Sequence, residues 1–310
     1  MTTAPSPSGV LVVDKPAGPT SFDVVARVKG ALRARKAGHA GTLDPLATGV
    51  LVVCLGDAVR LQQFLAEGDK SYEATVVFGA GTLTEDGEGE VVARADASAL
   101  SEQELLAALP SLRGEILQLP PMFSAVRVGG RRLFEAARAG EVVARSPRKV
   151  RVDSLELLEL GPAAGGIRPA RLAVSCGKGT YVRTLASDLG RALGLPAHLA
   201  ALRRTRSSGF ELREAVALES LEALAKEGGP EAVQGLLVPP AAALRALPEA
   251  RVLPREAADL SFGRSVAALG CEGGLFRAVD EAGRLVAVCR ASSGRLKPVR
   301  VFLSAAELGR

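Results

Sequence analysis

Aromatic residues, histidine and cysteine are scarce in this 310-residue chain, and their scarcity excludes several kinds of site. The chain has no tryptophan, two tyrosines, two histidines and four cysteines. The cysteines form no CxxC pair and lie far from both histidines in the sequence, so neither a zinc site nor a disulfide framework is predicted. We expect four reduced, buried thiols, at Cys54, Cys176, Cys271 and Cys289.

Long apolar runs and targeting segments are also missing. The leader MTTAPSPSG has neither a basic start nor an apolar stretch, so residues 1–8 are expected to form a flexible tail. No apolar run approaches the roughly 20 residues that a membrane-spanning helix needs. These absences favour a soluble cytoplasmic protein without a membrane partner.

Motifs for nucleotide-driven chemistry begin in two places, but neither is complete. GAGTLT (79–84) lacks the third glycine and the following helix of a dinucleotide fingerprint. GKGT (177–180) lacks the upstream glycine that a phosphate-binding loop requires. There is no GxSxG motif, and the histidines fit no triad order. We therefore expect neither a cofactor nor a metal ion.

Positive charge is in modest excess. The net charge is +5 and the pI about 9.2, and most of the 39 basic residues are arginine. A guanidinium can bind phosphate through two parallel hydrogen bonds, so the excess is compatible with a nucleic-acid partner. A GC-rich genome would produce the same arginine bias, which leaves the interpretation open.

Strand-like and helical segments alternate irregularly, which favours a mixed α/β fold with a largely antiparallel sheet. Thr20 and Asp23 have the spacing of a capping box, which predicts the start of a helix. The segment 81–92 is typical of a hairpin with an acidic turn. The strands are expected at 9–14, 49–55, 71–78, 149–160 and 169–176, and further helices at 101–109 and from about Thr180 to Leu193.

Composition divides the chain into two domains. Residues 9–248 are expected to form the larger, catalytic domain, which ends in a Gly-, Pro- and Ala-rich linker over 228–248. Short strands between glycine turns at 249–310 favour a small β-barrel. Within the larger domain, residues 119–148 are rich in basic residues and carry a proline pair, which predicts an exposed, thumb-like insertion.

One loop, GHAGTLDPLATGVL at 38–51, holds a single acid between glycines. Taken locally, Asp44 before Pro45 is an ordinary turn residue or a helix N-cap. A functional interpretation is also open, because glycines allow a ligand to approach closely. An aspartate can act as a nucleophile when a cation orients its carboxylate.

Several long motifs, including this loop, resemble the TruB family of tRNA pseudouridine synthases in order and spacing. They are DKPAGPTS (14–21), GHAGTLDPLATGVL (38–51), DKSYEATV (69–76), LPPMFSAVRVGGRRLFEAARAG (119–140), CGKGTYVRTLASDLG (176–190) and AHLAALRRTRSSGF (197–210). Residues 249–310 resemble a PUA domain more weakly. Phe123 and Phe134 stand where the family commonly has tyrosine, and Arg127 where it has lysine, which puts hydroxyl-mediated RNA contacts at the two phenylalanines in doubt.

The resemblance implies a pseudouridine synthase fold and a role for each matching residue. Asp44 would be the catalytic nucleophile and Arg183 its ion-pair partner, while Tyr72 would stack on the target base and could serve in removing the C5 proton. The other pocket positions would be Tyr181 and Leu202, and His39 would contact displaced nucleotides. The candidate RNA-binding arginines, from the insertion and from the segment 202–210, are Arg127, Arg131, Arg132, Arg203 and Arg204.

The implied reaction is the cofactor-free isomerisation of uridine 55, flipped out of the tRNA T loop. The PUA-like domain would bind the acceptor stem. We expect a monomer that needs no protein partner. Three alternatives stay open: a non-catalytic tRNA-binding or RNA-folding protein, a related synthase that acts on ribosomal RNA within a guide-RNA particle, and a base-removing glycosidase.

Overall fold

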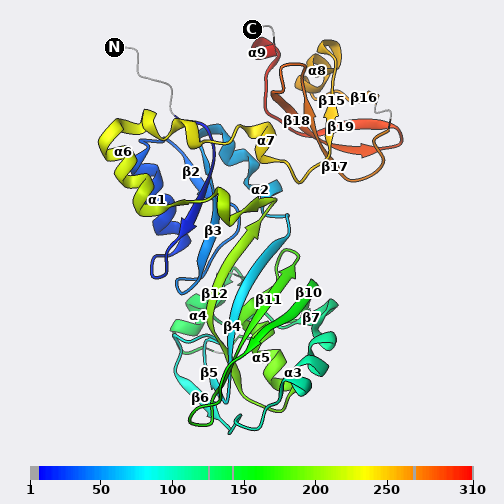
Figure 1. Ribbon diagram of the computed structural model, residues 1–310. Coiled ribbons are helices and arrows are strands. Elements are labelled where there is room, and N and C mark those ends of the chain that lie inside the picture. The colour runs from blue at the N-terminus through cyan, green and yellow to red at the C-terminus, as the bar shows by residue number, and fades with distance from the viewer. Residues whose placement is uncertain (1–6, 125, 142, 268–269, 309–310) are drawn as a thin grey trace.

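A computed structural model describes residues 7–124, 126–141, 143–267 and 270–308, apart from the side chains of residues 127, 132 and 138 (Figure 1). Two sheets organise this part of the chain. Ten strands from residues 9–217 form the larger sheet, and five strands from residues 249–301 form the smaller one. No helix among the described residues is long and apolar enough to cross a membrane.

The larger sheet is mixed and mostly antiparallel, as predicted. Parallel pairing occurs between β1 and β14 and between β3 and β12, whereas its other pairs are antiparallel. Its strand order is β14 (Val216–Ala217), β1 (Gly9–Lys15), β3 (Thr48–Leu55), β12 (Ala197–Ser207), β4 (Lys70–Phe78), β11 (Arg168–Cys176), β10 (Arg148–Leu160) and β7 (Gly114–Gln118), while β2 (Ala37–His39) pairs with β3 and β13 (Phe210–Glu211) with β12.

Strands β1 and β3 are apolar on both faces because both faces are covered. Leu11 and Val13 pack with helices α1 (Ser21–Ala31) and α6 (Leu218–Ala232), whereas Val10 and Val12 belong to a core on the opposite face. A strand that is buried on both faces appears in sequence as a continuous apolar run, which is how residues 9–14 and 49–55 could be predicted.

Helix starts follow their capping residues. The Thr20 hydroxyl accepts from the Asp23 amide at 3.1 Å, which completes the predicted capping box of α1. Ser101 caps α3 (Glu102–Ala108) in the same way. Helix α5 (Val182–Ala192) packs on β12, and the predicted hairpin is formed by β5 (Ala80–Thr82) and β6 (Val91–Arg94). Short helical turns complete this part: η1 (Gly56–Leu61), α2 (Gln62–Leu65), η2 (Leu109–Leu112) and η3 (Leu212–Glu214).

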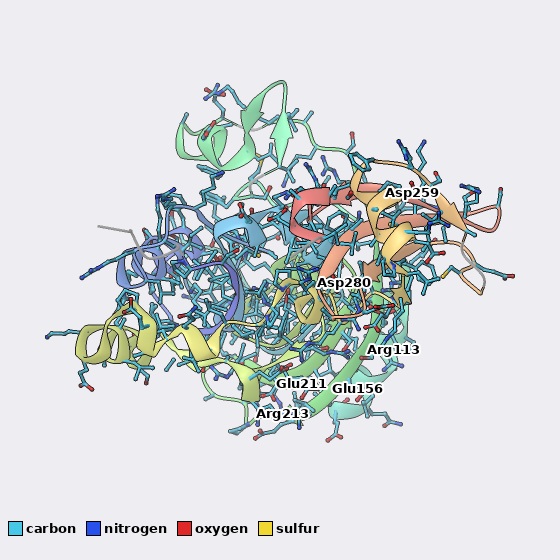
Figure 2. All side chains as sticks on the ribbon, turned by 90° about the horizontal axis from the view of Figure 1, so that it is seen from above. Arg113, Glu156, Glu211, Arg213, Asp259 and Asp280 are labelled. Atoms are coloured by element: carbon cyan, nitrogen blue, oxygen red, sulfur yellow. The ribbon has the colours of Figure 1, made fainter. Side chains whose placement is uncertain are left out.

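The thumb-like insertion projects from the larger sheet. It carries a small hairpin, β8 (Arg127–Val128) and β9 (Arg131–Arg132), followed by α4 (Leu133–Arg138). Figure 2 shows this pale green hairpin and helix standing clear of the rest of the chain. Residues 128–131 of the hairpin are exposed, while the side chains of Arg127 and Arg132 lie outside the described residues.

The predicted linker is not a loose connection, so that interpretation was wrong. Helix α6 runs to Ala232 across a break at Gly229, whose φ is 73°, and η4 (Gln234–Leu236) and α7 (Pro240–Ala243) follow it. Ala243 and Leu244 are buried in the core with Val10. The small residues of this stretch thus serve close packing as well as turns.

The C-terminal sheet is curled and open, and its strand order is β15 (Glu249–Arg251), β17 (Leu275–Val279), β18 (Leu285–Ser292), β19 (Arg295–Val301) and β16 (Val266–Ala267). Helices α8 (Pro254–Ser261) and α9 (Ala305–Leu308) flank it. Val279, Leu285 and Val288 share a core cluster with Val10 and Val50 of the larger sheet. The two sheets are therefore packed together by apolar contacts.

Candidate active site

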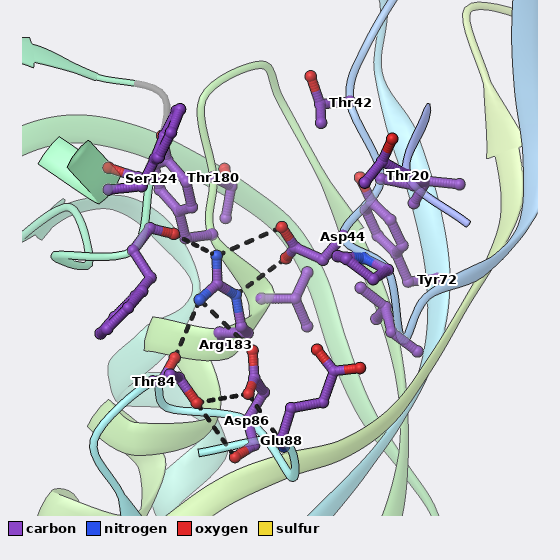
Figure 3. A pocket seen from close by; sticks show the side chains of 17 residues that line it. Thr20, Thr42, Asp44, Tyr72, Thr84, Asp86, Glu88, Ser124, Thr180 and Arg183 are labelled. Atoms are coloured by element: carbon purple, nitrogen blue, oxygen red, sulfur yellow. Dashed lines mark hydrogen bonds and ion pairs between the residues drawn. The ribbon is translucent and has the colours of Figure 1, made fainter. Parts of the chain in front are cut away.

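A cavity of about 480 Å³ lies beside the loop 38–51. Five of the residues singled out in the sequence line it together: Asp44, Tyr72, Tyr181, Arg183 and Leu202 (Figure 3). They come from the loop, from β4 and β12, and from the start of α5. Residues more than 150 positions apart in the chain thus meet in one pocket.

Glycines let the loop lie against β12. Gly41 and Gly49 have φ of 101° and 99°, in the left-handed region that disfavours residues with a side chain. A Cβ at Gly49 would stand 2.2 Å from the carbonyl oxygen of Arg204, so that position has room only for hydrogen. The glycines of the motif therefore fix the path that brings Asp44 to the cavity.

The backbone beside Asp44 is anchored by buried polar side chains. The Ser21 hydroxyl accepts from the Leu43 amide at 2.8 Å and donates to the Leu43 carbonyl at 2.9 Å. The Lys15 ammonium donates to the carbonyls of Pro45 at 3.1 Å and Ala47 at 2.7 Å, and to that of its neighbour Pro16. These contacts hold the residues on both sides of the carboxylate.

We expect Lys15→Met to destabilise the fold, because it leaves three carbonyls without their donor.

The size of this effect should depend on pH, because burial lowers the pKa of Lys15 to about 8. Between that pH and about 10.4, where an unfolded lysine titrates, the unfolded state binds more protons, so the Lys15 contribution to stability rises with pH. The free energy of unfolding of wild type relative to Lys15→Met should rise by on the order of 1–3 kcal/mol from pH 8 to 10, as measured by urea titration. A constant difference would contradict the burial of this ammonium.

Arg183 binds Asp44 through two nitrogens. Its Nε lies 2.9 Å from Asp44 Oδ2, and its Nη2 lies 3.4 Å from Oδ1. The remaining donors reach the carbonyls of Thr84, at 2.9 Å, and Phe123, at 2.8 Å. The Arg183 side chain is 5% exposed and that of Asp44 is 36% exposed. The guanidinium is thus fixed from the protein side, while the carboxylate remains open to the cavity.

A second acid, Asp86, also faces Arg183, and it was not among the residues predicted from the sequence. Its Oδ2 lies 3.5 Å from Arg183 Nη1, and its side chain is 7% exposed. It belongs to the acidic turn of the hairpin predicted at 81–92. Glu85, just before it, adopts a φ of 63° and accepts from the Thr184 hydroxyl at 2.6 Å, which turns Asp86 inward. One signal was present: the cluster EDGEGE exceeds what a hairpin turn needs.

The walls of the cavity are aromatic and apolar. Tyr72 and Leu202 are 8% and 7% exposed, and burial raises the pKa of Tyr72. Gln118 fixes Tyr181, because its amide accepts from the Tyr181 N–H at 2.7 Å and donates to the Tyr181 carbonyl at 3.0 Å. Phe123 completes this wall. A flat ring can therefore be enclosed beside the Asp44 carboxylate.

Three further candidates lie away from the cavity lining. His39 is on β2, where its Nδ1 is buried without a hydrogen-bond partner among the described residues and burial lowers its pKa. Arg203 pairs with Asp14 at 2.8 Å. Arg131 is exposed on the insertion and pairs with Glu141 at 3.1 Å. Contacts of these three with RNA stay predictions.

Arg204 requires a correction, because its side chain has no exposed surface with which to bind RNA. The sequence indicated a basic segment at 202–210 that leads to a strand. Residues 202–207 form the end of β12 in the middle of the sheet, and alternation along that strand points Arg203 outward and Arg204 inward.

Known proteins resemble this chain along most of its length. Three family models match consecutive parts. They describe the N-terminal domain of the TruB family pseudouridylate synthases, at residues 29–182, the C-terminal domain of tRNA pseudouridylate synthase B, at 183–246, and the C-terminal part of tRNA pseudouridine synthase II, at 247–303.

Several curated relatives are named tRNA pseudouridine synthase B. The tRNA pseudouridine synthase B of Stutzerimonas stutzeri is 45% identical over 299 residues, which cover 96% of each chain. That of Symbiobacterium thermophilum is 51% identical over 256 residues, or 82% of each chain. Among solved structures, a Cbf5-Nop10-Gar1 complex matches with a TM-score of 0.76 at 29% identity, covering 97% of this chain and 86% of that one. An H/ACA RNP bound to a substrate RNA containing 2'-deoxyuridine matches at 0.73 and 27%, covering 98% and 92%.

Proposed function

The chain belongs to the TruB family of pseudouridylate synthases, and on that premise we propose that it converts uridine 55 in the T loop of tRNA to pseudouridine. The observation that carries the proposal is the bidentate Asp44–Arg183 pair inside a cavity walled by Tyr72, Tyr181 and Leu202. A base that stays stacked inside an RNA helix could not enter a cavity enclosed by these side chains. The substrate must therefore be flipped out of the RNA before it can react.

The chemistry follows from what each side chain presents. Arg183 aims the Asp44 carboxylate at the sugar–base linkage of the enclosed uridine, and Asp44 acts as the nucleophile. The glycosidic bond between N1 and C1′ breaks, the base turns within the cavity, and a new bond joins C5 to C1′. The C5 proton leaves to solvent, N1 takes up a proton from solvent, and the bond between Asp44 and the nucleotide breaks as the product forms, so the atoms balance without a co-reactant. Stacking on Tyr72, worth about 1–3 kcal/mol, retains the base while it is detached.

Release of tritium from C5 tests this function directly. Purified protein is incubated with a tRNA transcript that carries [5-³H]uridine, and the product is mapped for pseudouridine. We expect one tritium equivalent released per tRNA and pseudouridine at position 55, with no release from a transcript that has cytidine there. Free uracil in place of pseudouridine would identify a glycosidase, and binding without any product would identify a non-catalytic RNA-binding protein.

The thumb-like insertion and the C-terminal sheet reach away from the cavity, and we assign them to parts of the tRNA beyond the target uridine. We assign the T loop to the thumb-like insertion, which stands clear of the rest of the chain in Figure 2 and contributes Phe123 and Phe134 to the cavity lining, and the acceptor stem to the C-terminal sheet. Both surfaces belong to this one chain, so we assign the reaction to a monomer without a protein partner, acting in the cytoplasm on tRNA.

Arg131→Ala combined with Arg132→Ala should weaken tRNA binding about tenfold and reduce the slope of log Kd against log salt by one to two. Each lost phosphate contact removes about one released counterion. Kd is measured by filter binding from 50 to 200 mM salt. The control is Arg171→Ala, an exposed arginine on β11 outside the cavity lining, which should leave the slope unchanged. An identical slope for the double variant would remove the insertion from the RNA interface.

A further inference from the structure

Three basic side chains gather on one face of the C-terminal sheet. Arg290 lies on β18, Arg295 and Lys297 lie on the neighbouring β19, and all three residues are exposed (Figure 1). The antiparallel register places Arg290 directly opposite Lys297. The next pair along, Ala291 and Leu296, is buried in the core of this sheet, so alternation turns the basic side chains to its outer face. We call Arg290, Arg295 and Lys297 the β18–β19 patch.

The patch has no acid to balance it among the described residues. Other arginines in this part of the chain have carboxylate partners at 2.8–3.2 Å: Arg251 and Arg277 pair with Glu249, Arg264 with Asp259 and Arg284 with Asp280. None of the three patch residues forms such a pair with a described residue. Arg295 instead donates to the Ser265 carbonyl at 2.6 Å, beside β16. Exposed cations without a counter-charge thus concentrate on these two strands.

The stability of the fold does not account for this arrangement. Residues directly opposite on antiparallel strands have Cβ atoms about 5 Å apart, and like charges there destabilise the sheet. A neutral residue in place of Arg290 or Lys297 would remove that repulsion without loss of buried surface, because both residues are exposed. An anion that lies across the two strands turns the repulsion into attraction, since both side chains can converge on one phosphate group.

The shape of the patch indicates a long polyanion. Its three cations follow the two strands over an open sheet face, and they line no part of the cavity that holds Asp44. Ser292, directly opposite Arg295, adds an exposed hydroxyl, and serine commonly contacts phosphate oxygens together with arginine and lysine. The row of phosphates in an RNA backbone meets such a surface at several points at once.

We propose that the β18–β19 patch binds the phosphate backbone of an RNA helix other than the arm that carries the target uridine. The inference rests on the proposed function, in which the C-terminal sheet takes the acceptor stem, and it assigns that contact to one face and to phosphates instead of base edges. Phosphate contacts carry no sequence information, so tRNAs of different sequence are bound alike. Val288 of β18 lies in the core shared with the larger sheet, so the patch and the cavity engage one tRNA together and each contact strengthens the other.

Arg290→Gln combined with Lys297→Gln tests the inference on two RNAs, a full tRNA transcript and a hairpin of the T arm alone. Kd is measured by filter binding from 50 to 200 mM salt. For the full tRNA we expect Kd to rise about tenfold and the slope of log Kd against log salt to fall by one to two. For the hairpin Kd should change less than about twofold. Tm should stay the same or rise, because the repulsion between the two strands is gone.

Two further variants separate charge from packing. Arg290→Lys combined with Lys297→Arg keeps both charges and should bind the full tRNA as wild type does. Arg251→Gln combined with Arg264→Gln is the matched control, since these exposed arginines of the same part of the chain already have carboxylate partners, and Kd should not change.

Three outcomes would overturn the inference: an unchanged Kd for the full tRNA, an equal loss for the tRNA and the hairpin, or a loss in the variant that exchanges the two cations. Binding is measured without turnover. A wild-type protein that forms no pseudouridine but binds tRNA through the patch would therefore contradict the proposed function and leave this contact standing, which separates the two failures.

Discussion

Asp44→Asn is expected to abolish pseudouridine formation, with a rate at least about 10⁴-fold below wild type, while the affinity for tRNA changes less than threefold. Asparagine has the size of aspartate and can still accept a hydrogen bond from Arg183. It lacks the negative oxygen that attacks the nucleotide in the proposed reaction. The loss should therefore appear in the chemical step alone, measured as tritium release under single-turnover conditions, with Kd from filter binding.

The matched control for this variant is Asp57→Asn. Asp57 is an exposed acid in η1 outside the cavity lining, so its amide variant should turn over at the wild-type rate. Residual activity of Asp44→Asn above about 1% of wild type would show that another group attacks the nucleotide. Loss of tRNA binding would show that Asp44 contributes to the RNA interface.

Arg183→Met is expected to reduce both activity and stability. It removes the group that aims Asp44 and leaves the buried Asp86 without its cation, which typically costs about 3–5 kcal/mol. We expect the single-turnover rate to fall about 10³-fold and Tm to fall by several degrees. Arg183→Lys should recover part of the stability but little of the rate, because one ammonium cannot reproduce the fork that meets both Asp44 oxygens.

Adding Asp86→Asn to Arg183→Met separates the loss of stability from the loss of rate. Asp86→Asn combined with Arg183→Met removes the unpaired buried charge, so Tm should recover while the rate stays low. Arg191→Met is the control on the same helix, since that arginine is 74% exposed and pairs only with Asp188 among the described residues. If the double variant recovered the rate as well, Arg183 would act through folding and not by orienting Asp44.

Local features of the fold could be predicted from the sequence because their causes are local. Side-chain alternation and continuous apolar runs marked the main strands, and the Thr20–Asp23 spacing marked the start of α1. The motifs that contain Asp44 and Arg183 indicated the centre of the site. The structure brings the two side chains together, with Arg183 Nε 2.9 Å from Asp44 Oδ2. Their roles in catalysis remain predictions for the experiments above.

Features that depend on contacts between distant parts of the chain could not be predicted in the same way. An acid in a turn has the same local sequence whether it faces water or a buried arginine, so Asp86 was missed. Arg203 and Arg204 are adjacent and chemically identical, and only the position of β12 within the sheet separates their surroundings. The alanine-rich stretch after α6 was interpreted as a linker because composition does not show which core it packs into.

The apolar contact between the two sheets has a consequence for substrate choice. Val279, Leu285 and Val288 share one core with Val10 and Val50, so apolar contacts hold the C-terminal sheet against the larger sheet. The fold therefore sets the distance between the C-terminal sheet and the cavity. An RNA that is held at one end by the C-terminal sheet would present to Asp44 only a uridine at the matching distance, so its geometry would select the nucleotide before any base is recognised.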